Sequence, residues 1–353
     1  MQNHKERQPW KKEEKRLAIS IFLRSPSTYR YFREIMILPS ESTIRMWLSS
    51  KKCHSTGFNK NLFEKIKIKV DTMSDMEKAC VLMFDDMSIK QCLEYSPVYD
   101  IIEGFQDLGR LGRSNKIAKQ ASVFMIRGLY YQWKLPIGYF VSEKGLNGSD
   151  SSSSIKCCIS SLENIGLAVK AIVCDQSTTN TRALKELGVS KEAPYLLNGK
   201  GDKIFAIYDP PHLLKTLRNN LLSHDFIYEE RRVSFDDIVK LFELERQSGT
   251  IRAAHQLSSA HISPNNFQKM SVSLAAQIFS HTTAAALKTA IATGQLTTST
   301  ALETANFLQK INSLFDAMNS RTLFSKNPDN CALSKQNPKL LHFSMKPWFY
   351  SQI

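Results

Sequence analysis

The chain has 353 residues and a formal net charge of +14 at neutral pH, with an isoelectric point near 9.4. This length allows two or three domains with hydrophobic cores of their own, and 42% hydrophobic with 23% charged residues is typical of a globular protein. So basic a chain favours a polyanionic partner, nucleic acid before membrane. No apolar run approaches the roughly 18 residues that cross a bilayer. No apolar secretory segment follows the basic N-terminus, so we expect neither a membrane protein nor a secreted one.

The seven cysteines form no CxxC pair and have no zinc-ligand spacing. Several of them stand inside apolar runs, which indicates buried, reduced thiols. Reduced thiols are typical of a cytosolic or nuclear protein.

Residues 8–50 are predicted to form three short helices that carry many basic side chains. Ser40 or Ser42 is expected to cap the third helix. Three such helices are typical of a helix-turn-helix, whose last helix enters the major groove of DNA. The alternative is a basic module that docks a protein or simply packs. The helices are expected at Glu13–Arg24, from Ser25 onward, and at Thr43–Leu48. The side chains expected to contact DNA are Arg30, Arg33, Arg45, Lys51 and Lys52.

Residues 60–208 alternate β-type and helical patterns. Antiparallel strands followed by a helix and a further strand are typical of the start of an RNase H-like fold. Residues 95–102 and 121–131 are expected to form an antiparallel hairpin, and the serine-rich residues 147–154 a loop that also caps the helix after it. The remaining elements are predicted as helices over 61–70, 75–78 and 155–165, a helix that ends at Gly188, and strands over 79–84, 135–141, 171–174 and 203–208.

Two of these apolar runs end in aspartate. Asp85 and Asp86 follow the first, and Asp175 follows the second. A carboxylate at a strand end lies at the edge of the sheet, and two such carboxylates are how RNase H-like nucleotidyl transferases hold two Mg²⁺ ions. The alternative is that each aspartate caps the helix that follows it. That alternative is favoured for one aspartate alone, but the pair favours a metal site.

Residues 209–325 lose the strand signals and are predicted to form an all-helical domain that is inserted into, or appended to, the sheet domain. Alanine-rich stretches indicate tightly packed helices. Residues 326–353 form a polar tail interrupted by proline. The chain contains no glycine-rich Walker loop, which excludes a conventional P-loop GTPase. The predicted fold class is therefore mixed α/β.

Five segments together resemble P-element transposases and the related THAP-domain transposase-derived proteins. The resemblance covers residues 10 to 325 approximately, in the order and spacing of that family. The last two segments are the most specific. The segments are residues 38–47 (LPSESTIRMW), 84–88 (FDDMS), 174–181 (CDQSTTNT), 208–220 (YDPPHLLKTLRNN) and 314–321 (LFDAMNSR).

The resemblance implies a cut-and-paste DNA transposase with a helix-turn-helix, an RNase H-like domain with an Asp-Asp-Glu metal site, and a helical insertion that binds GTP as a cofactor. By motif position, Asp85 matches the first metal carboxylate and Asp175 the second. Asp86 is the rival for the first role, and strand alternation lets only one of the two neighbours face the site.

The resemblance also assigns the nucleotide site. Lys215 matches the lysine that contacts the phosphates, while Asp316 and Asn319 match the element that reads guanine. Asp209 is a lesser candidate. An aspartate accepts hydrogen bonds from guanine N1–H and from its amine, and Asp316 and Asn319 share one helix face. Without the resemblance, Lys215 would be a solvated lysine on a basic helix and the other two an exposed helix end.

The chain also departs from the family pattern. The third catalytic acid of the family is a glutamate beyond the insertion, whereas Asp329 is the only acid after Asn319 in this sequence, and no zinc-binding THAP module precedes the helices. We therefore expect a truncated copy or a fragment whose RNase H-like domain is incomplete. The cofactors implied are Mg²⁺ and GTP. The expected partners are DNA (transposon ends and target) and GTP, with a homo-oligomer as an open option, in the nucleus.

Overall fold

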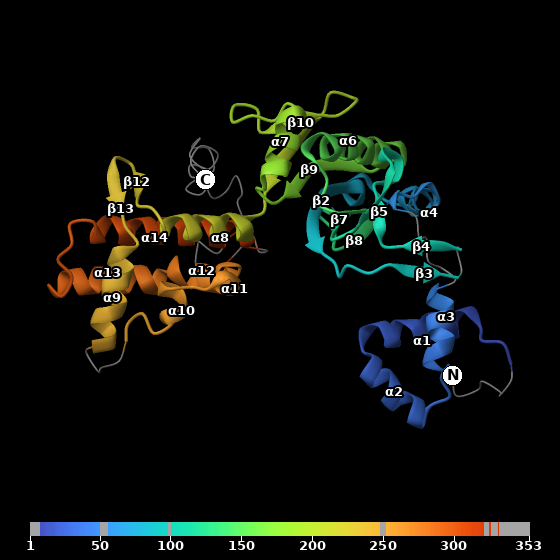
Figure 1. Cartoon of the computed structure of the whole chain (residues 1–353), viewed down its shortest axis with the longest axis horizontal. Helices are drawn as coiled ribbons and strands as arrows, with labels where there is room; N and C mark the ends of the chain where they lie inside the picture. The colour runs from blue at the N-terminus through green and yellow to red at the C-terminus, as the bar shows by residue number, and fades with distance from the viewer. Residues whose placement is uncertain are drawn as a thin grey trace.

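The computed structural model describes residues 8–49, 56–97, 100–247 and 252–320, together with Ser325 and Cys331. Figure 1 shows three parts in chain order: a group of three helices, a sheet with flanking helices, and a helical part that ends the described chain. Each part has a hydrophobic core of its own. Lys51 and Lys52, and almost all of the predicted tail, lie outside the described residues.

The first part consists of the three predicted helices, α1 (Lys12–Arg24), α2 (Pro26–Ile35) and α3 (Glu41–Ser49). Tyr29 is fully buried in their small core, and its hydroxyl donates a hydrogen bond to the carbonyl of Pro39 at 2.7 Å. Of the two candidate caps for α3, Ser40 is the one that accepts the backbone N–H of Thr43, at 3.2 Å. Ser25 caps α2 in the same way.

The second part is built on one large sheet with the strand order β10-β11-β9-β2-β7-β8-β5-β6, in which β1 also pairs with β8. The strands are β1 (Gly57–Phe58), β2 (Ala79–Ser88), β5 (Phe105–Asp107), β6 (Arg113–Ile117), β7 (Gln120–Gly128), β8 (Lys134–Ser142), β9 (Ala168–Cys174), β10 (Tyr195–Leu197) and β11 (Lys203–Tyr208). The strands β2, β9 and β11 are parallel neighbours, and β2 pairs antiparallel with β7. Three parallel strands therefore end at one edge of the sheet.

Helices cover this sheet and complete its core. They are α4 (Lys60–Val70), α5 (Asp75–Lys78), α6 (Gly148–Asn164) and α7 (Thr178–Glu186), and a short 3₁₀ turn spans Gly109–Leu111. Figure 1 shows α6 along the sheet, and α6 packs on α7. The predicted end of α7 is confirmed, because Gly188 follows the helix with a positive φ of 87°.

Three local predictions in this domain were wrong. The serine-rich residues after Asn147 are not a loop, since α6 starts at Gly148 with Asn147 as its N-cap. Residues 95–102 do not pair with β7, because β2 occupies that position. Instead β3 (Glu94–Ser96) and β4 (Ile101–Glu103) pair with each other in a separate ribbon. The strand β2 also runs past its predicted end, through Asp85 and Asp86 to Ser88.

The third part is mostly helical, but the all-helical prediction was wrong in one place. A hairpin of two short strands, β12 and β13, lies between the first two helices. The elements are α8 (Pro210–Leu221), β12 (Phe226–Tyr228), β13 (Arg231–Val233), α9 (Asp236–Gln247), α10 (Ser259–Ile262), α11 (Asn266–Lys269), α12 (Val272–Ile278), α13 (His281–Ala292) and α14 (Ala301–Asn319). Among the described residues, no helix is long and apolar enough to cross a membrane.

Candidate functional site

Three aspartates stand in register across the parallel strands, at the level where β9 and β11 end and β2 continues. Asp85 belongs to β2, Asp175 follows β9, and Asp209 follows β11. Each lies two residues beyond one shared row of paired residues, so all three are at the same height on neighbouring strands. That row consists of Met83, Val173 and Ile207. Sequence reasoning expected the first two on neighbouring strands, and the strand pairing confirms this.

Local hydrogen bonds hold two of these carboxylates in place. Asp175 accepts the side-chain amide of Asn180 at 2.6 Å and the backbone N–H of Ser177 at 3.2 Å. Asp209 is the N-cap of α8 and accepts the backbone N–H of His212 at 3.2 Å. The cap alternative for Asp85 and Asp175 holds for neither, because Asp85 lies inside β2 and Ser177 is the N-cap of α7. Asp209 is the aspartate that caps a helix.

Asp85 and Asp86 lie inside β2, and their side chains point to opposite faces of the strand. By this alternation, Asp86 lies on the same face of β2 as the buried Phe84. Asp85 lies on the same face as Met83, which is paired with Val173 of β9, two residues before Asp175. Desolvation raises the pKa of the Asp86 carboxyl, and the charges of Asp85 and Asp175 raise it further, while the neighbouring Ser122 hydroxyl lowers it. The charges of both Asp85 and Asp175 therefore act on the Asp86 carboxyl.

This carboxylate edge suits a divalent cation. Carboxylate oxygens are the ligands that Mg²⁺ prefers, and a cation would relieve the repulsion among them. In the described parts of the chain, no three carboxylate, histidine or cysteine side chains converge closely enough to chelate an ion. Among the described residues the edge therefore offers fewer than three such ligands, and water or substrate would have to complete the coordination of an ion.

The first and last helices of the insertion pack against each other, as expected. The pocket between them is lined by residues 210–217 of α8 and 311–318 of α14. The start of α14 is bonded to the hairpin that follows α8, so the two helices run antiparallel and the end of α14 lies at the start of α8. The lining of the pocket is apolar, however, and includes none of the three predicted nucleotide ligands. Its lining residues are Pro210, Leu213, Leu214, Leu217, Ile311, Leu314, Phe315 and Met318.

The predicted nucleotide ligands lie at that same end of the helix pair, on other faces. At about 100° per residue, Lys215 and Asp316 lie far round their helices from the apolar stripe, and Asn319 about a quarter turn from it. Lys215 is half-buried, Asn319 is exposed, and Asp316 accepts a hydrogen bond from Asn312 at 2.8 Å. Their convergence on a bound nucleotide stays a prediction.

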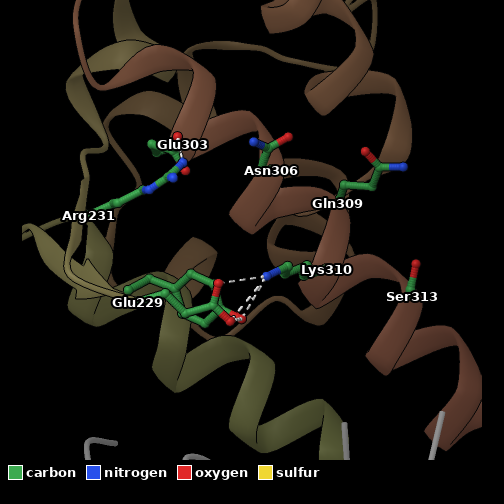
Figure 2. Close-up of a pocket in the computed structure, with 8 residues that line it drawn as sticks. Glu229, Arg231, Glu303, Asn306, Gln309, Lys310 and Ser313 are labelled. Atoms are coloured by element: carbon green, nitrogen blue, oxygen red, sulfur yellow. Dashed lines mark hydrogen bonds and ion pairs between the residues drawn. The ribbon is translucent and has the colours of Figure 1, made fainter. Parts of the chain in front are cut away.

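A polar cleft of about 520 Å³ lies between the β12–β13 hairpin and α14 (Figure 2). Lys310 donates to the hydroxyl of Tyr228 at 3.0 Å and pairs with Glu229 at 3.2 Å. Arg231 pairs with Glu303 at the other end of the cleft. Each cation is matched by a carboxylate, so the four charged side chains that line the cleft carry no net charge.

Two of the predicted DNA contacts are engaged in ion pairs. The Glu41 carboxylate forms ion pairs with the guanidinium groups of Arg30, at an N–O distance of 2.8 Å, and of Arg45, at 3.4 Å. Arg33 lies on the same helix as Arg30 and forms no salt bridge among the described residues. Exposed pairs of this kind are weak, so DNA phosphates can compete for the two arginines.

Sequence reasoning missed several buried polar residues in the insertion. Arg218 is fully buried and donates to the carbonyls of Gln268 and Lys269, although it looked like a solvated cation beside Lys215. Its spacing of four residues from Leu214, a buried neighbour on α8, was the available signal. Asp237, which is buried and accepts a hydrogen bond from Thr304 of α14, has the same spacing of four from buried Leu241 on α9.

Three segments match known domain families. Residues 1–47 match the transposable element P transposase-like helix-turn-helix domain, residues 54–188 the TNP-like RNase H N-terminal domain, and residues 211–331 the TNP-like GTP-binding insertion domain. The chain belongs to the P-element transposase family. It contains the helix-turn-helix, the RNase H-like part and the GTP-binding insertion domain of that family, in that order.

Relatives and one solved structure agree with this membership. The chain is 28% identical to the human DNA transposase THAP9 over 96% of its own length and 38% of the relative's. It is 27% identical to the Drosophila melanogaster transposable element P transposase, over 89% of its own length and 39% of the relative's. The chain thus spans about two fifths of each relative. Its fold matches the Drosophila P element transposase strand transfer complex with a TM-score of 0.80, at 24% identity, over 96% of this chain and 73% of that one.

Proposed function

We propose that this protein derives from, or is part of, a cut-and-paste DNA transposase that acts on phosphodiesters by a two-metal Asp-Asp-Glu mechanism. The observation that carries the proposal is the register of aspartates across three parallel strands in an RNase H-like sheet. Membership in the P-element family supports DNA as the substrate. It also supports a nuclear location.

In this proposal Asp85 and Asp175 are the two protein ligands of Mg²⁺, because they share a height and a face. The ion would act as a Lewis acid on the scissile phosphodiester. The hydrogen bonds from Asn180 and Ser177 hold the Asp175 carboxylate at the strand end. In the family pattern the third acid is a glutamate beyond the insertion. This sequence has no glutamate after Asn319.

Binding of Mn²⁺, followed by electron paramagnetic resonance, tests the metal site. Asp85→Asn and Asp175→Asn should each weaken binding at least tenfold, because each removes a charged ligand. Asp86→Asn should change it much less, and Asp71→Asn, at an exposed aspartate after α4, is the matched control. Loss of binding in Asp86→Asn, with Asp85→Asn unaffected, would move the first ligand to Asp86.

Cleavage of DNA tests the catalytic part of the proposal. With Mg²⁺ or Mn²⁺, this chain should nick DNA only weakly, since two-metal catalysis needs both ions positioned for in-line attack. Robust nicking that is lost in Asp175→Asn would show that the chain needs no third acid beyond its own residues. Nicking that survives Asp175→Asn would reject this edge of the sheet as the active site.

We further propose that the insertion binds GTP through Lys215, Asp316 and Asn319, with Asp209 beside them. Lys215 would neutralise phosphate charge as a point cation, and Asp316 would select guanine, because adenine has no N1–H and carries its amine at C6. The family of the insertion and the shared end of α8 and α14 support this placement.

Calorimetric titration of GTP against ATP tests it. Asp316→Asn should reduce the preference for GTP, whereas Lys215→Ala should weaken both triphosphates alike. Asp236→Asn, at an exposed aspartate of α9, is the control for a lost surface charge. Equal affinity for both nucleotides, or none for either, would reduce the insertion to a structural domain.

The second candidate is a catalytically inactive, domesticated regulator that keeps DNA binding by the helix-turn-helix. The match of residues 1–47 to the family's helix-turn-helix domain supports its DNA-binding part. DNA affinity that is unchanged by Mg²⁺ and by Asp175→Asn, together with no strand cleavage, would support the regulator over the transposase.

A further inference from the structure

The start of α8 offers no free backbone N–H group to a ligand. The N–H of Asp209 donates to the carbonyl of Cys174 at 2.9 Å, and that of His212 donates to the Asp209 carboxylate at 3.2 Å. The two residues between them are Pro210 and Pro211, which have no N–H. Helix N-termini bind phosphates through these groups. A phosphate near this helix must therefore be held by side chains.

The side chain of His212 is placed for this task. His212 and Lys215 are three residues apart and share one face of α8, away from the apolar stripe that contacts α14. Both side chains are half-buried. On that face, Lys215 and His212 are the two basic side chains of the first turns of the helix.

The His212 ring has one edge turned inward. Its Nδ1 atom is buried, lies 3.8 Å from the Asp209 carboxylate and forms no hydrogen bond within the described residues. About one third of the side chain is exposed, which leaves Nε2 as the ring nitrogen that a ligand can reach. In an imidazolium both nitrogens are donors, so Nδ1–H would serve Asp209 while Nε2–H faces outward.

We propose that His212 binds the phosphate chain of the nucleotide through Nε2, beside Lys215, and that Asp209 is the positioning residue that orients the ring. The proposal rests on nucleotide binding by the insertion, as proposed above. It assigns Asp209 a defined role: its carboxylate closes the start of α8 and faces the histidine. Two basic side chains then replace the backbone anchor that the two prolines remove.

Calorimetry of the full chain with GTP, GDP and guanosine tests the proposal. His212→Gln should weaken GTP at least tenfold, because a charge-assisted hydrogen bond to phosphate is lost, and should leave guanosine unchanged. His212→Arg, which restores a cationic donor, should recover most of the affinity. His224→Gln is the matched control, at an exposed histidine beyond the other end of α8. Asp209→Asn, which keeps a good helix cap, should weaken GTP but not guanosine.

The outcomes separate this inference from the function on which it rests. If the unmodified chain binds no GTP, nucleotide binding itself is wrong. If it binds GTP and His212→Gln binds within twofold of it, or loses guanosine equally, the role of His212 is overturned. Should His212→Gln fail to fold, nitrogen-15 spectra of the unmodified chain decide. The histidine Nε2 signal that is missing from the spectrum of His212→Arg belongs to His212, and it should shift when GTP is added. If that signal does not shift, the contact is refuted.

Discussion

The carboxylate of Asp237 anchors α14, the helix that carries the proposed guanine-reading residues, and replacing it should cost measurable stability. Asp237 is 1% exposed and accepts the hydroxyls of Thr298 at 2.6 Å and Thr304 at 2.7 Å. Thr304 also accepts the backbone N–H of Ser234 at 3.1 Å. This buried network joins the start of α9 to α14 across more than sixty residues of sequence.

The magnitude follows from those two hydrogen bonds. Each bond to a buried charged acceptor contributes about 1.5–3 kcal/mol. Asp237→Asn keeps one acceptor oxygen but loses the charge, so we expect the free energy of unfolding to fall by about 2–3 kcal/mol. Asp237→Ala, which orphans both hydroxyls and leaves a cavity, should lower it by about 4 kcal/mol.

The neighbouring Asp236 provides a matched control. It is exposed and stands in the same first turn of α9, so both aspartates interact with the helix dipole. Asp236→Asn should cost no more than about 0.3–1 kcal/mol. Thermal unfolding followed by circular dichroism at 222 nm reports the helical insertion, and Asp237→Asn should lower its midpoint by on the order of 10 °C. A loss within 0.5 kcal/mol of that in Asp236→Asn would refute the reasoning.

Three further predictions concern other parts of the molecule. Burial raises the pKa of Tyr29 to about 12, so its stabilising contribution is complete below pH 10 and is lost as the pH rises through 12, by up to about 1.4 kcal/mol per pH unit. The free energy of unfolding of the helix-turn-helix should therefore fall less steeply with rising pH above 10 in Tyr29→Phe than in the unmodified chain. An unchanged slope would contradict this role of Tyr29. Arg33→Ala should weaken DNA binding and reduce the salt slope by about one, more than Arg30→Ala, because Glu41 already engages Arg30; fluorescence anisotropy at several salt concentrations measures both. Arg218→Met should destabilise the insertion by about 2 kcal/mol in urea unfolding, because two carbonyls at the end of α11 each lose a charged donor and keep only neutral donors, such as the N–H of Ser271 or the amide of Asn219. A neutral result would show that the cost of burying the charge outweighs those bonds.

Local pattern was sufficient where strand-forming residues run together. The run over 203–208 predicted β11 to the residue, although its side chains alternate between exposed and buried, and the run over 171–174 predicted the end of β9, because β-branched and aromatic residues favour strands. The aspartates after the strands were visible for that reason.

Tertiary contacts overrode local preference elsewhere. Serines after Asn147 favour a loop by intrinsic propensity, yet they are helical here because Ser151 and Ser154 are buried and Ser152 donates to Glu186 of α7 at 3.1 Å. The β12–β13 hairpin turns at Glu229 and Glu230, both with positive φ, a conformation for which the sequence shows no glycine or asparagine signal. Its ion pair to Lys310 comes from a helix eighty residues away.

The sequence alone determined the order of the domains and the family, and it supplied the candidate residues for carboxylate and nucleotide chemistry, because those depend on residue type and short spacing. Tertiary structure decided what those residues can do together. It aligned Asp85, Asp175 and Asp209 in one row, since strand register is set by packing across the whole sheet. It also buried Arg218 and turned Nδ1 of His212 toward Asp209. Such contacts depend on segments far apart in the chain, whose approach no local pattern records.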